Sequence, residues 1–324
     1  MRAFGEWELQ DALILALPHY NTDWCSNLLN VFEAYKEFVC VVSQKQKVIL
    51  ISPNEEDFKT FFSKFDNVVF YKIDTNDTWI RDYGAIDVAN FGRILSYDFK
   101  FNAWGKKYPY ELDNNVNSEL FKFFKGELKN IDFVLEGGSI DFNGRGTMLT
   151  TTKCLLNKNR NPKYKKADIE KKMMELFGIH TVIWLENGFL LGDDTDSHVD
   201  TLARFIDPTT IVYASCDDPK DPHYTELKKM ENELKKTKFK IVPVPLPEPQ
   251  FDGERRLAAT YINFIFINNA IVLPTYNCKT DKVAVEIFKK NIKDRLILQV
   301  NASEFIKQNG SLHCLSQNRF AGNR

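Results

Sequence analysis

Short apolar runs alternate with amphipathic segments along most of the chain, and this alternation constrains the fold more than any other feature. Five segments carry apolar residues at helical spacing: 26–38, 52–65, 168–178, 224–236 and 281–290. In the second we expect Ser52 as N-cap, Pro53 at the first helical position and Glu55 completing a capping box. Seven runs look like strands: 12–18, 47–52, 67–73, 181–185, 210–215, 239–244 and 295–300. The pattern predicts an α/β protein.

Two further segments predict β-hairpins, with turns at 143–144 and 268–269. Hairpins interrupt a simple strand-helix alternation, which argues against a plain doubly wound sheet. The sequence contains neither a G-x-G-x-x-G fingerprint nor a G-x-x-x-x-G-K-[ST] loop. Nucleotide binding therefore has no support from sequence motifs.

Charge and cysteine usage narrow the possible functions. The formal net charge is −1 over 324 residues, and no run of Lys and Arg is interleaved with aromatic residues, so we expect no nucleic-acid partner. The apolar run 12–18 is too short and too acidic in its flanks for a signal peptide, and no stretch could span a membrane. Six cysteines lie scattered without C-x-x-C pairs, so we expect reduced thiols and a cytoplasmic protein.

The segment 192–205 (GDDTDSHVDTLARF) concentrates acidic residues around a histidine. A calcium loop starting at Asp194 would place Val199 sixth and Phe205 twelfth, where Gly and Glu are required, and no other histidine stands at zinc-ligand spacing. We therefore expect no metal. His198 and Asp200, if they lie on a strand, share one face and can hold a base beside a carboxylate. Alternatively, His198 is a hydrogen-bonded core residue.

Two other segments contain residues suited to a cationic substrate. In 76–84 (NDTWIRDYG), Trp79 and Asp82 can offer an aromatic face and a neutralising carboxylate. Alternatively, Trp79 lies in the core, and Arg81 and Asp82 form a surface ion pair. Glu136 precedes two glycines, which allow close approach of the backbone. Alternatively, Glu136 is a solvated glutamate in a turn, without a functional role.

Cys314, in the segment 309–319 (NGSLHCLSQNR), is the candidate nucleophile. Only about 3% of a free thiol is ionised at pH 7, so a catalytic cysteine needs a cationic neighbour, which His198 or a charged substrate could supply. Cys154, near a turn, is a weaker rival. The remaining cysteines are predicted to be packing residues: Cys25, Cys40, Cys216 and Cys278.

With these segments in view, the chain resembles the agmatine deiminase family, which includes the Porphyromonas-type peptidylarginine deiminases. The resemblance rests on NDTWIRDYG, LEGGSIDFNGRGTMLTT, LNKNRNP, DDTDSHVDTLARF and GSLHC, which occur in the family's order, and it extends over nearly the whole chain. It implies a pentein fold: five ββαβ-type units around a pseudo-fivefold axis. We accordingly expect one catalytic domain over residues 1–324.

The resemblance also implies roles for individual residues. Cys314 would attack the guanidinium carbon, and His198 would act as general acid and base. Asp82 and Asp200 would grip the guanidinium nitrogens, and Glu136 would pair with the histidine. No cofactor is implied.

Further positions implied by the resemblance bear on the substrate. Trp79 would line the pocket, and Asp194 is a candidate for binding the far amine of agmatine. The chain departs from the family at Gly310–Leu312, which bears on the shape of the pocket. We expect a monomer or homodimer acting on agmatine. The alternatives are a deiminase of free or peptide-bound arginine, and a non-catalytic binding protein for cationic metabolites.

Overall fold

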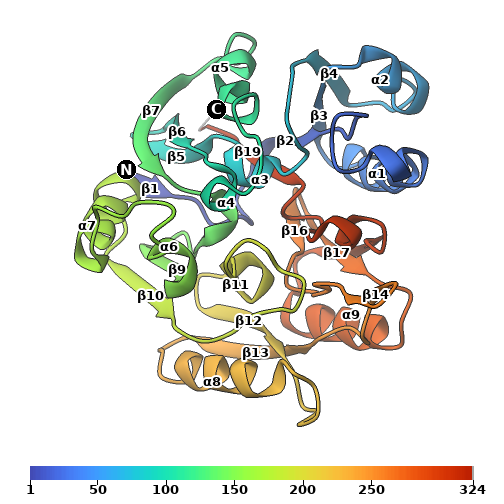
Figure 1. The fold of residues 1–324 in the computed structure, drawn as a ribbon. Helices are drawn as coiled ribbons and strands as arrows, with labels where there is room; N and C mark the ends of the chain where they lie inside the picture. The colour runs from blue at the N-terminus through green and yellow to red at the C-terminus, as the bar shows by residue number, and fades with distance from the viewer. Residues whose placement is uncertain (323–324) are drawn as a thin grey trace.

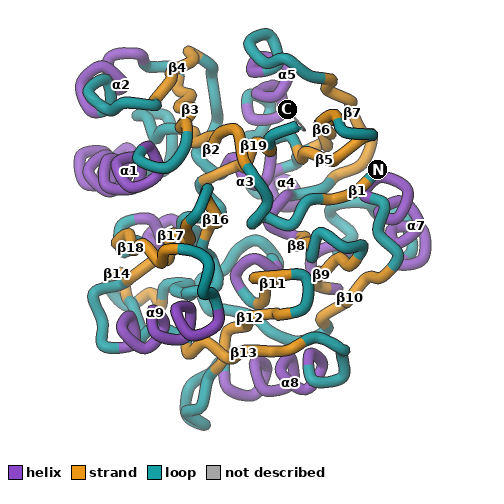
Figure 2. Tube along the Cα trace, turned by 180° about the vertical axis from the view of Figure 1, so that it is seen from behind, coloured by secondary structure: helices purple, strands orange, loops and turns teal. Residues whose placement is uncertain are grey.

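Five sheets of three or four strands share one arrangement in the computed structural model, which describes residues 1–322. In each sheet one strand pairs antiparallel with a second, and the second pairs parallel with a third that follows it after a helical crossover. The sheets follow one another around the molecule, as the colours of Figure 1 show, and the longer helices lie on the outer rim in both views (Figures 1 and 2).

The strands of the five sheets, in the order in which neighbours pair, have the following bounds. They are β19 (Ser316–Phe320), β2 (Gln10–Ala16), β3 (Lys47–Ser52) and β4 (Val68–Lys72); β1 (Arg2–Ala3), β5 (Ile86–Asn90), β6 (Arg93–Lys100) and β7 (Glu127–Val134); β10 (Thr181–Leu185), β9 (Thr147–Thr151) and β8 (Ile140–Phe142); β11 (Ala203–Asp207), β12 (Thr210–Ser215) and β13 (Lys240–Pro245); and β16 (Ile265–Ile267), β17 (Ala270–Thr275) and β18 (Leu296–Asn301). A small hairpin, β14 (Phe251–Asp252) and β15 (Arg255–Arg256), stands apart.

The longer helices are the crossovers of these sheets, and shorter ones turn the chain near its centre. The α-helices are α1 (Leu28–Ser43), α2 (Glu55–Phe61), α3 (Ile80–Tyr83), α4 (Ala103–Lys106), α5 (Val116–Leu120), α6 (Thr152–Leu155), α7 (Lys166–Phe177), α8 (Tyr224–Leu234) and α9 (Thr280–Asn291). The 3-10 helices are η1 (Cys25–Asn27), η2 (Asp113–Asn115), η3 (Gly137–Ser139), η4 (Val199–Thr201) and η5 (Phe305–Gln308).

The predicted α/β class, strands and hairpins are confirmed, but the start of one helix was predicted wrongly. Ser52 is the last residue of β3, and α2 begins at Glu55 with Asn54 as its N-cap. The Asn54 side chain accepts a hydrogen bond from the Glu56 amide, while the Ser52 hydroxyl accepts one from the Asn54 amide. Asn54 is therefore the N-cap of α2, and Ser52 stabilises the turn that precedes the helix.

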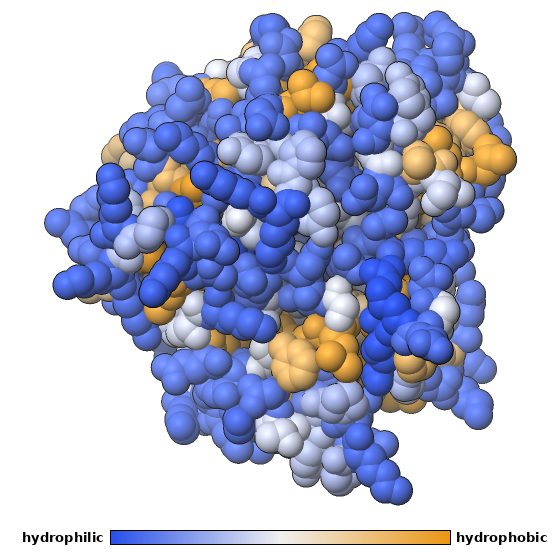
Figure 3. Space-filling model, viewed as in Figure 1, coloured by the Kyte–Doolittle hydropathy of each residue, from blue (hydrophilic) through white to orange (hydrophobic). Residues whose placement is uncertain are grey.

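Apolar packing joins the five sheets. One cluster of buried side chains runs from β2 and α1 through β12 and β17 to the residues preceding β19, and a second fills the space between β5–β9 and α7. The face shown in Figure 3 is mainly hydrophilic, with apolar side chains in small separate patches. None of the described helices is both long enough and apolar enough to cross a bilayer.

Candidate active site

Cys314 lines an acidic, aromatic pocket with about 420 Å³ of empty space, part of it open to solvent. None of the described residues that line it is a lysine or an arginine. Four aspartates and three aromatic residues line it: Asp23, Asp77, Asp82, Asp194, Trp79, Trp104 and Tyr108. Burial, reinforced by the charges of Asp23 and Asp194 and opposed by hydrogen bonds from Thr78, raises the pKa of Asp77 to about 7. Crowded carboxylates beside aromatic faces favour a cationic ligand.

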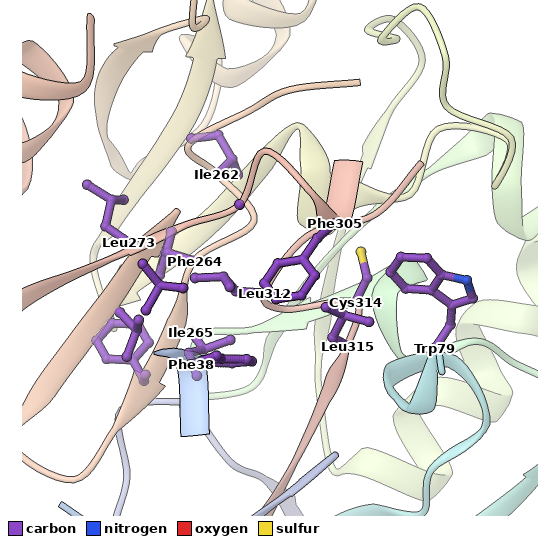
Figure 4. Close-up of a cluster of buried hydrophobic side chains, with 14 of the residues drawn as sticks. Phe38, Trp79, Ile262, Phe264, Ile265, Leu273, Phe305, Leu312, Cys314 and Leu315 are labelled. Atoms are coloured by element: carbon purple, nitrogen blue, oxygen red, sulfur yellow. The ribbon is translucent and has the colours of Figure 1, made fainter. Parts of the chain in front are cut away.

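The thiol of Cys314 lies in the turn that precedes β19. Figure 4 shows its sulfur beside the ring of Trp79, while Leu312 and Leu315 lie among the buried apolar side chains. Asn263 Nδ2 donates a hydrogen bond to Sγ at 3.1 Å, and Sγ lies 3.7 Å from Asp200 Oδ2. Burial, together with the nearby carboxylates, raises the pKa of Cys314 well above its ordinary value, so the sulfur is a thiol in the free protein.

Asp82 lies within the short helix α3 and is almost completely buried. The Gly138 amide donates to Asp82 Oδ1 at 2.9 Å, and Trp104 Nε1 donates to Oδ2 at 2.9 Å. Burial and the charges of Asp200 and Glu136 nevertheless raise the pKa of Asp82 well above its ordinary value. A bound cation would reverse this effect by stabilising the carboxylate.

Arg81, the neighbour of Asp82, does not form the surface ion pair that the sequence left open. It is buried, and its guanidinium donates to the His313 carbonyl at 3.1 Å and to Asn318 Oδ1 at 2.7 Å. Consecutive residues of α3 thus point to different sides of the chain.

His198 and Asp200 lie close together, but not on the predicted strand. His198 is the N-cap of η4, and Asp200 lies within that 3-10 helix. The assignment to a strand was wrong because the preceding residues, Asp196 and Ser197, take left-handed backbone conformations with φ of 70° and 64°. Two such residues in succession cannot continue an extended strand.

The His198 ring is buried and neither of its nitrogens has a hydrogen-bond partner among the described residues. Its Nδ1 lies 3.6 Å from Asp82 Oδ1. Burial lowers the pKa of His198 to about 3, so the ring is neutral at physiological pH. It can therefore accept a proton, but it does not supply the cationic neighbour that Cys314 needs.

Asp200 is fully buried, and its two oxygens differ. Oδ2 receives a hydrogen bond from His313 Nδ1 at 2.6 Å, while Oδ1 has no partner among the described residues. Burial alone would raise the pKa of Asp200, but the hydrogen bond and charge of His313 outweigh it and lower that pKa. The carboxylate is ionised and has one oxygen free to bind a donor.

Glu136 accepts its side-chain hydrogen bonds from an arginine and lies at ion-pair distance from the histidine. Its carboxylate receives hydrogen bonds from Arg160 Nε at 3.0 and 3.2 Å, and the nearest His198 nitrogen is 4.0 Å away. Arg160 also contacts Asp196 and donates to the Thr195 carbonyl at 2.9 Å, which ties Glu136 to the loop before His198. The implied pairing of Glu136 with His198 is present only at ion-pair distance and without a hydrogen bond, so the role of Glu136 stays a prediction.

Asp194 lies at the mouth of the pocket. Its carboxylate receives hydrogen bonds from the Tyr108 hydroxyl at 2.9 Å and from Asn309 Nδ2 at 3.4 Å. The buried Asp193 shapes this loop by accepting bonds from the Thr195 and Ser197 amides at 3.1 and 2.7 Å. The pocket thus has carboxylates both around Cys314 and at its outer end.

The other cysteines do not approach this geometry. Cys154 is buried behind Glu136, with its sulfur 3.9 Å from Oε2, and does not line the pocket. Cys40, Cys216 and Cys278 are partly buried, as expected for packing residues. Cys25 is exposed, so the prediction of a packing role was wrong for that residue. It lies in η1, where the chain enters α1 on the surface.

A model of the Porphyromonas-type peptidyl-arginine deiminase family matches residues 2–319 of this chain. A relative from Legionella pneumophila is 33% identical over 324 residues, covering 97% of this chain and 93% of the relative. This chain is a member of that deiminase family.

Two solved structures of agmatine deiminases extend the match within this deiminase family. A substrate-bound cysteine-to-serine variant of the C. jejuni enzyme is 54% identical, with a TM-score of 0.98, covering 100% of this chain and 97% of that one. The Enterococcus faecalis enzyme is 27% identical, with a TM-score of 0.92, covering 100% of this chain and 96% of that one. The resemblance seen in the sequence is confirmed.

Six residues around the site of this deiminase were missed by the sequence reasoning: Asp23, Trp104, Tyr108, Arg160, Asn263 and His313. Arg160 lies within the motif LNKNRNP, whose role was left unassigned, and His313 stands directly before the candidate nucleophile. No motif or spacing in the sequence connected Trp104 or Asn263 with the site. Their partners lie 22 and 51 positions away in the chain, so no local spacing reveals them.

One group in the deiminase site has the residue types of a metal site. Ligand atoms of Glu136, Cys154 and His198 lie within 4.8 Å of one another, and all three residues are buried. The guanidinium of Arg160 already neutralises Glu136, and burial raises the pKa of Cys154 well above its ordinary value. A metal ion would have to displace the Arg160 guanidinium and drive off the proton of a thiol whose pKa is raised, so the group fits a metal poorly.

Proposed function

We propose that this chain is an agmatine deiminase, a hydrolase that converts agmatine and water to N-carbamoylputrescine and ammonia. The observation that carries the proposal is the Cys314 thiol, 3.7 Å from the ionised Asp200, in a pocket whose charged lining residues are all acidic. The agmatine deiminase from C. jejuni, with substrate bound in its structure, supports this assignment through its 54% identity. N-carbamoylputrescine links the reaction to polyamine synthesis.

Binding of the guanidinium between Asp82 and Asp200 is the first step. Each charge-assisted hydrogen bond contributes roughly 1.5–3 kcal/mol and orients the central carbon toward the sulfur. Trp79 lies against the planar cation, and Asp194 binds the amine at the other end of the substrate. The bound cation offsets the carboxylate charges that keep Cys314 protonated, so substrate binding itself favours the thiolate.

Covalent chemistry follows from this arrangement. The neutral His198 accepts the thiol proton, and Sγ forms a bond to the guanidinium carbon. His198 then returns the proton to a terminal nitrogen, the C–N bond breaks, and ammonia leaves an S-alkylthiouronium. Water adds to the same carbon while His198 takes its proton, and cleavage of the C–S bond releases the ureido product and the thiol. These steps need no metal or organic cofactor.

Glu136 serves this cycle by stabilising His198 when it is protonated, from a distance of 4.0 Å. Arg160 holds the glutamate in place. Because the pair Glu136–Arg160 is close to neutral, His198 returns readily to its neutral form after each proton transfer.

We also infer that the five sheets are five ββαβ-type units around a pseudo-fivefold axis, forming one domain over residues 1–324. The repeated strand pattern supports this inference, as does the return of β19 to the first sheet. We expect a cytoplasmic monomer or homodimer without a nucleic-acid partner.

The acidic lining favours agmatine over the arginine alternatives. Agmatine carries a second positive charge at its far end, whereas free arginine adds a carboxylate beside its ammonium, and Asp23, Asp77 and Asp194 would repel that carboxylate. A peptide-bound arginine lacks that carboxylate charge but needs an open channel for its chain. A non-catalytic binding protein would not place a thiol at the guanidinium carbon.

The test is product formation by purified protein from agmatine, free arginine and an arginyl peptide, measured as ammonia and ureido product. We expect turnover of agmatine, at least tenfold lower kcat/KM for the other two, and no product from Cys314→Ala. Cys216→Ala, at a cysteine outside the pocket, is the matched control and should retain full activity. No ammonia from agmatine with wild-type protein, or equal release by Cys314→Ala, would refute the assignment.

A further inference from the structure

A line of buried charged groups continues behind the catalytic residues, on the side away from the pocket that contains Cys314. His313 is 3% exposed, and both nitrogens of its ring contact carboxylates. Nδ1 lies 2.6 Å from Asp200 Oδ2, and Nε2 lies 2.8 Å from Glu6 Oε2. These three side chains come from the segment before β2, from η4 and from the turn before β19.

The hydrogen-bond geometry indicates the charge that this line carries. Ionised carboxylates only accept hydrogen bonds, so both nitrogens of His313 can donate only when the ring carries two hydrogens and a positive charge. Asp200 is ionised, as described above. Burial disfavours the charged form of Glu6, but Arg204 and His313 outweigh it and lower the pKa of Glu6 far below its ordinary value. A cation between two anions is the consistent arrangement.

Glu6 is itself held from two sides. The Phe266 amide donates to its Oε1 at 2.8 Å, and the Arg204 guanidinium contacts Oε2. Arg204 is fully buried, and Asp141 lies 3.3 Å from its Nε. Glu6 therefore cannot turn away from His313 without leaving buried charges unpaired, which makes it a fixed anchor.

A second pocket, with about 540 Å³ of empty space, lies on this far side and is lined by Glu6 and His313. Arg81, Gly137 and His313 line it, while Asp82 and Cys314, next in the chain to Arg81 and His313, line the pocket of the candidate active site. A single layer of backbone thus separates the two pockets. The His313 ring bridges that layer from Glu6 to Asp200.

We propose that His313, anchored by Glu6, is a positioning residue that keeps Asp200 ionised and turned so that its free oxygen binds the guanidinium. This inference rests on the proposed deiminase function. Without the His313 cation, Asp200 would compete for a proton with its acidic neighbours, and its Oδ2 would lose the bond that orients it. His313 lines the far pocket and not the pocket that contains Cys314, so its effect is transmitted through Asp200.

Other charged groups also lie close to Glu6, His313 and Asp200. They are Arg81 from α3, Asp82 from the same helix, Asp141 from β8, His198 from the loop before η4, and Arg204 from β11. None of them replaces His313, because none donates to Asp200 Oδ2.

The test is the pH profile of kcat/KM for agmatine in wild type, His313→Asn and Glu6→Gln. Asparagine retains a donor close to Nδ1 but carries no charge, so the variant separates charge from hydrogen bonding. An opposite charge at this distance shifts a pKa by about 1–3 units, so the acid limb should move to higher pH by about one unit or more in His313→Asn. We expect a smaller upward shift in Glu6→Gln, which keeps the histidine but removes its anchor.

His180→Asn, at an exposed histidine, is the matched control and should leave the profile unchanged. A merely structural role would lower the melting temperature or kcat without moving the acid limb, and that outcome would overturn the proposal. Glu6→Gln keeps the test decisive if His313→Asn does not fold.

A binding measurement separates this inference from the proposed reaction. Agmatine affinity is measured by calorimetry between pH 5 and 8 with Cys314→Ala and with Cys314→Ala/His313→Asn. If His313 has the positioning role, the affinity for agmatine is lost on acidification in both proteins, but the loss begins at a higher pH in the double variant than in Cys314→Ala. Superimposable curves, or no binding of agmatine by either protein, would overturn it. Absent turnover in wild type, with binding curves displaced as predicted, would refute the reaction alone.

Discussion

Single atoms decide the geometry at the centre of the site, and Gly138 is the clearest case. A Cβ at this position would lie 2.7 Å from His198 Nδ1 and 2.9 Å from oxygens of both Asp200 and Asp82. The Gly138 amide also donates to Asp82. Glycine is therefore required by close approach of the backbone to three catalytic candidates, not by an unusual φ.

We predict that Gly138→Ala lowers kcat/KM for agmatine by about a hundredfold or more, because displacement of reacting groups by 1 Å can cost that much. Steady-state kinetics and a thermal melt measure the effect. Gly322→Ala, whose Cβ would have only an ordinary contact at 3.6 Å, is the control. Full activity in Gly138→Ala would mean that His198, Asp82 and Asp200 are not the reacting set.

Gly310 shows how the segment Gly310–Leu312, which departs from the family pattern, affects the shape of the pocket. Its added Cβ would lie 2.2 Å from the Trp79 ring, so the ring packs directly on the backbone that leads to Cys314. Ser311 and Leu312 are buried and face away from solvent. The departure from the family pattern thus leaves the contact between Trp79 and the approach to Cys314 intact.

At the scale of elements, α4 is a left-handed turn that connects both ends of the substrate pocket. Ala103, Trp104, Gly105 and Lys106 have φ of 49°, 53°, 93° and 69°. Left-handed conformation costs roughly 1–2 kcal/mol for each residue other than glycine. The turn directs Trp104 toward Asp82, and Tyr108, just beyond it, reaches Asp194. This short element therefore links Asp82, the candidate for binding the guanidinium, with Asp194, the candidate for binding the far amine.

We predict that Trp104→Phe, which keeps an aromatic ring but removes the N–H donor, lowers kcat/KM for agmatine roughly tenfold to a hundredfold. A hydrogen bond to a charged group is worth about 1.5–3 kcal/mol, which gives this range. Trp184→Phe is the matched control, because it removes an indole donor to Glu170 outside the pocket. Equal kinetics for the two variants would show that Trp104 does not position Asp82.

At the scale of the whole molecule, the two ends of the chain meet in one sheet. β19 pairs antiparallel with β2, so the turn that carries Cys314 is fixed between the first and last sheets. Arg319 on β19 contacts Asp87 on β5, and Asp87 also accepts a bond from the Phe320 amide at 3.0 Å. The closing strand is thereby joined to two sheets, and the position of Cys314 depends on that closure.

We predict that Asp87→Ala destabilises the protein by roughly 3–5 kcal/mol, because it leaves the largely buried Arg319 without its carboxylate. Denaturant unfolding measures the change. Glu33→Ala, which breaks an exposed pair with Lys36, should cost less than about 1 kcal/mol. Similar losses in both variants would show that closure does not depend on the Arg319–Asp87 pair.

The sequence by itself determined the elements and the residue types of the site. Strand and helix periods are local, so runs such as 47–52 and 281–290 predicted β3 and α9 within about one residue. Cys314, His198, Asp82 and Asp200 stood out as candidates, but core or surface roles remained open for them until the resemblance to the family implied their functions. The motifs that contain these residues occur in the same order as in the family, and this order identified the family.

Only the tertiary structure decided how these residues are paired. Glu136 binds Arg160 across 24 positions, and His313 bridges Asp200 and Glu6 across 113 and 307 positions. No spacing in the chain encodes such contacts, because each depends on the packing of sheets far apart in the sequence. The same packing buries His198 and lowers its pKa to about 3, so the ring is neutral and is not a cationic neighbour for Cys314.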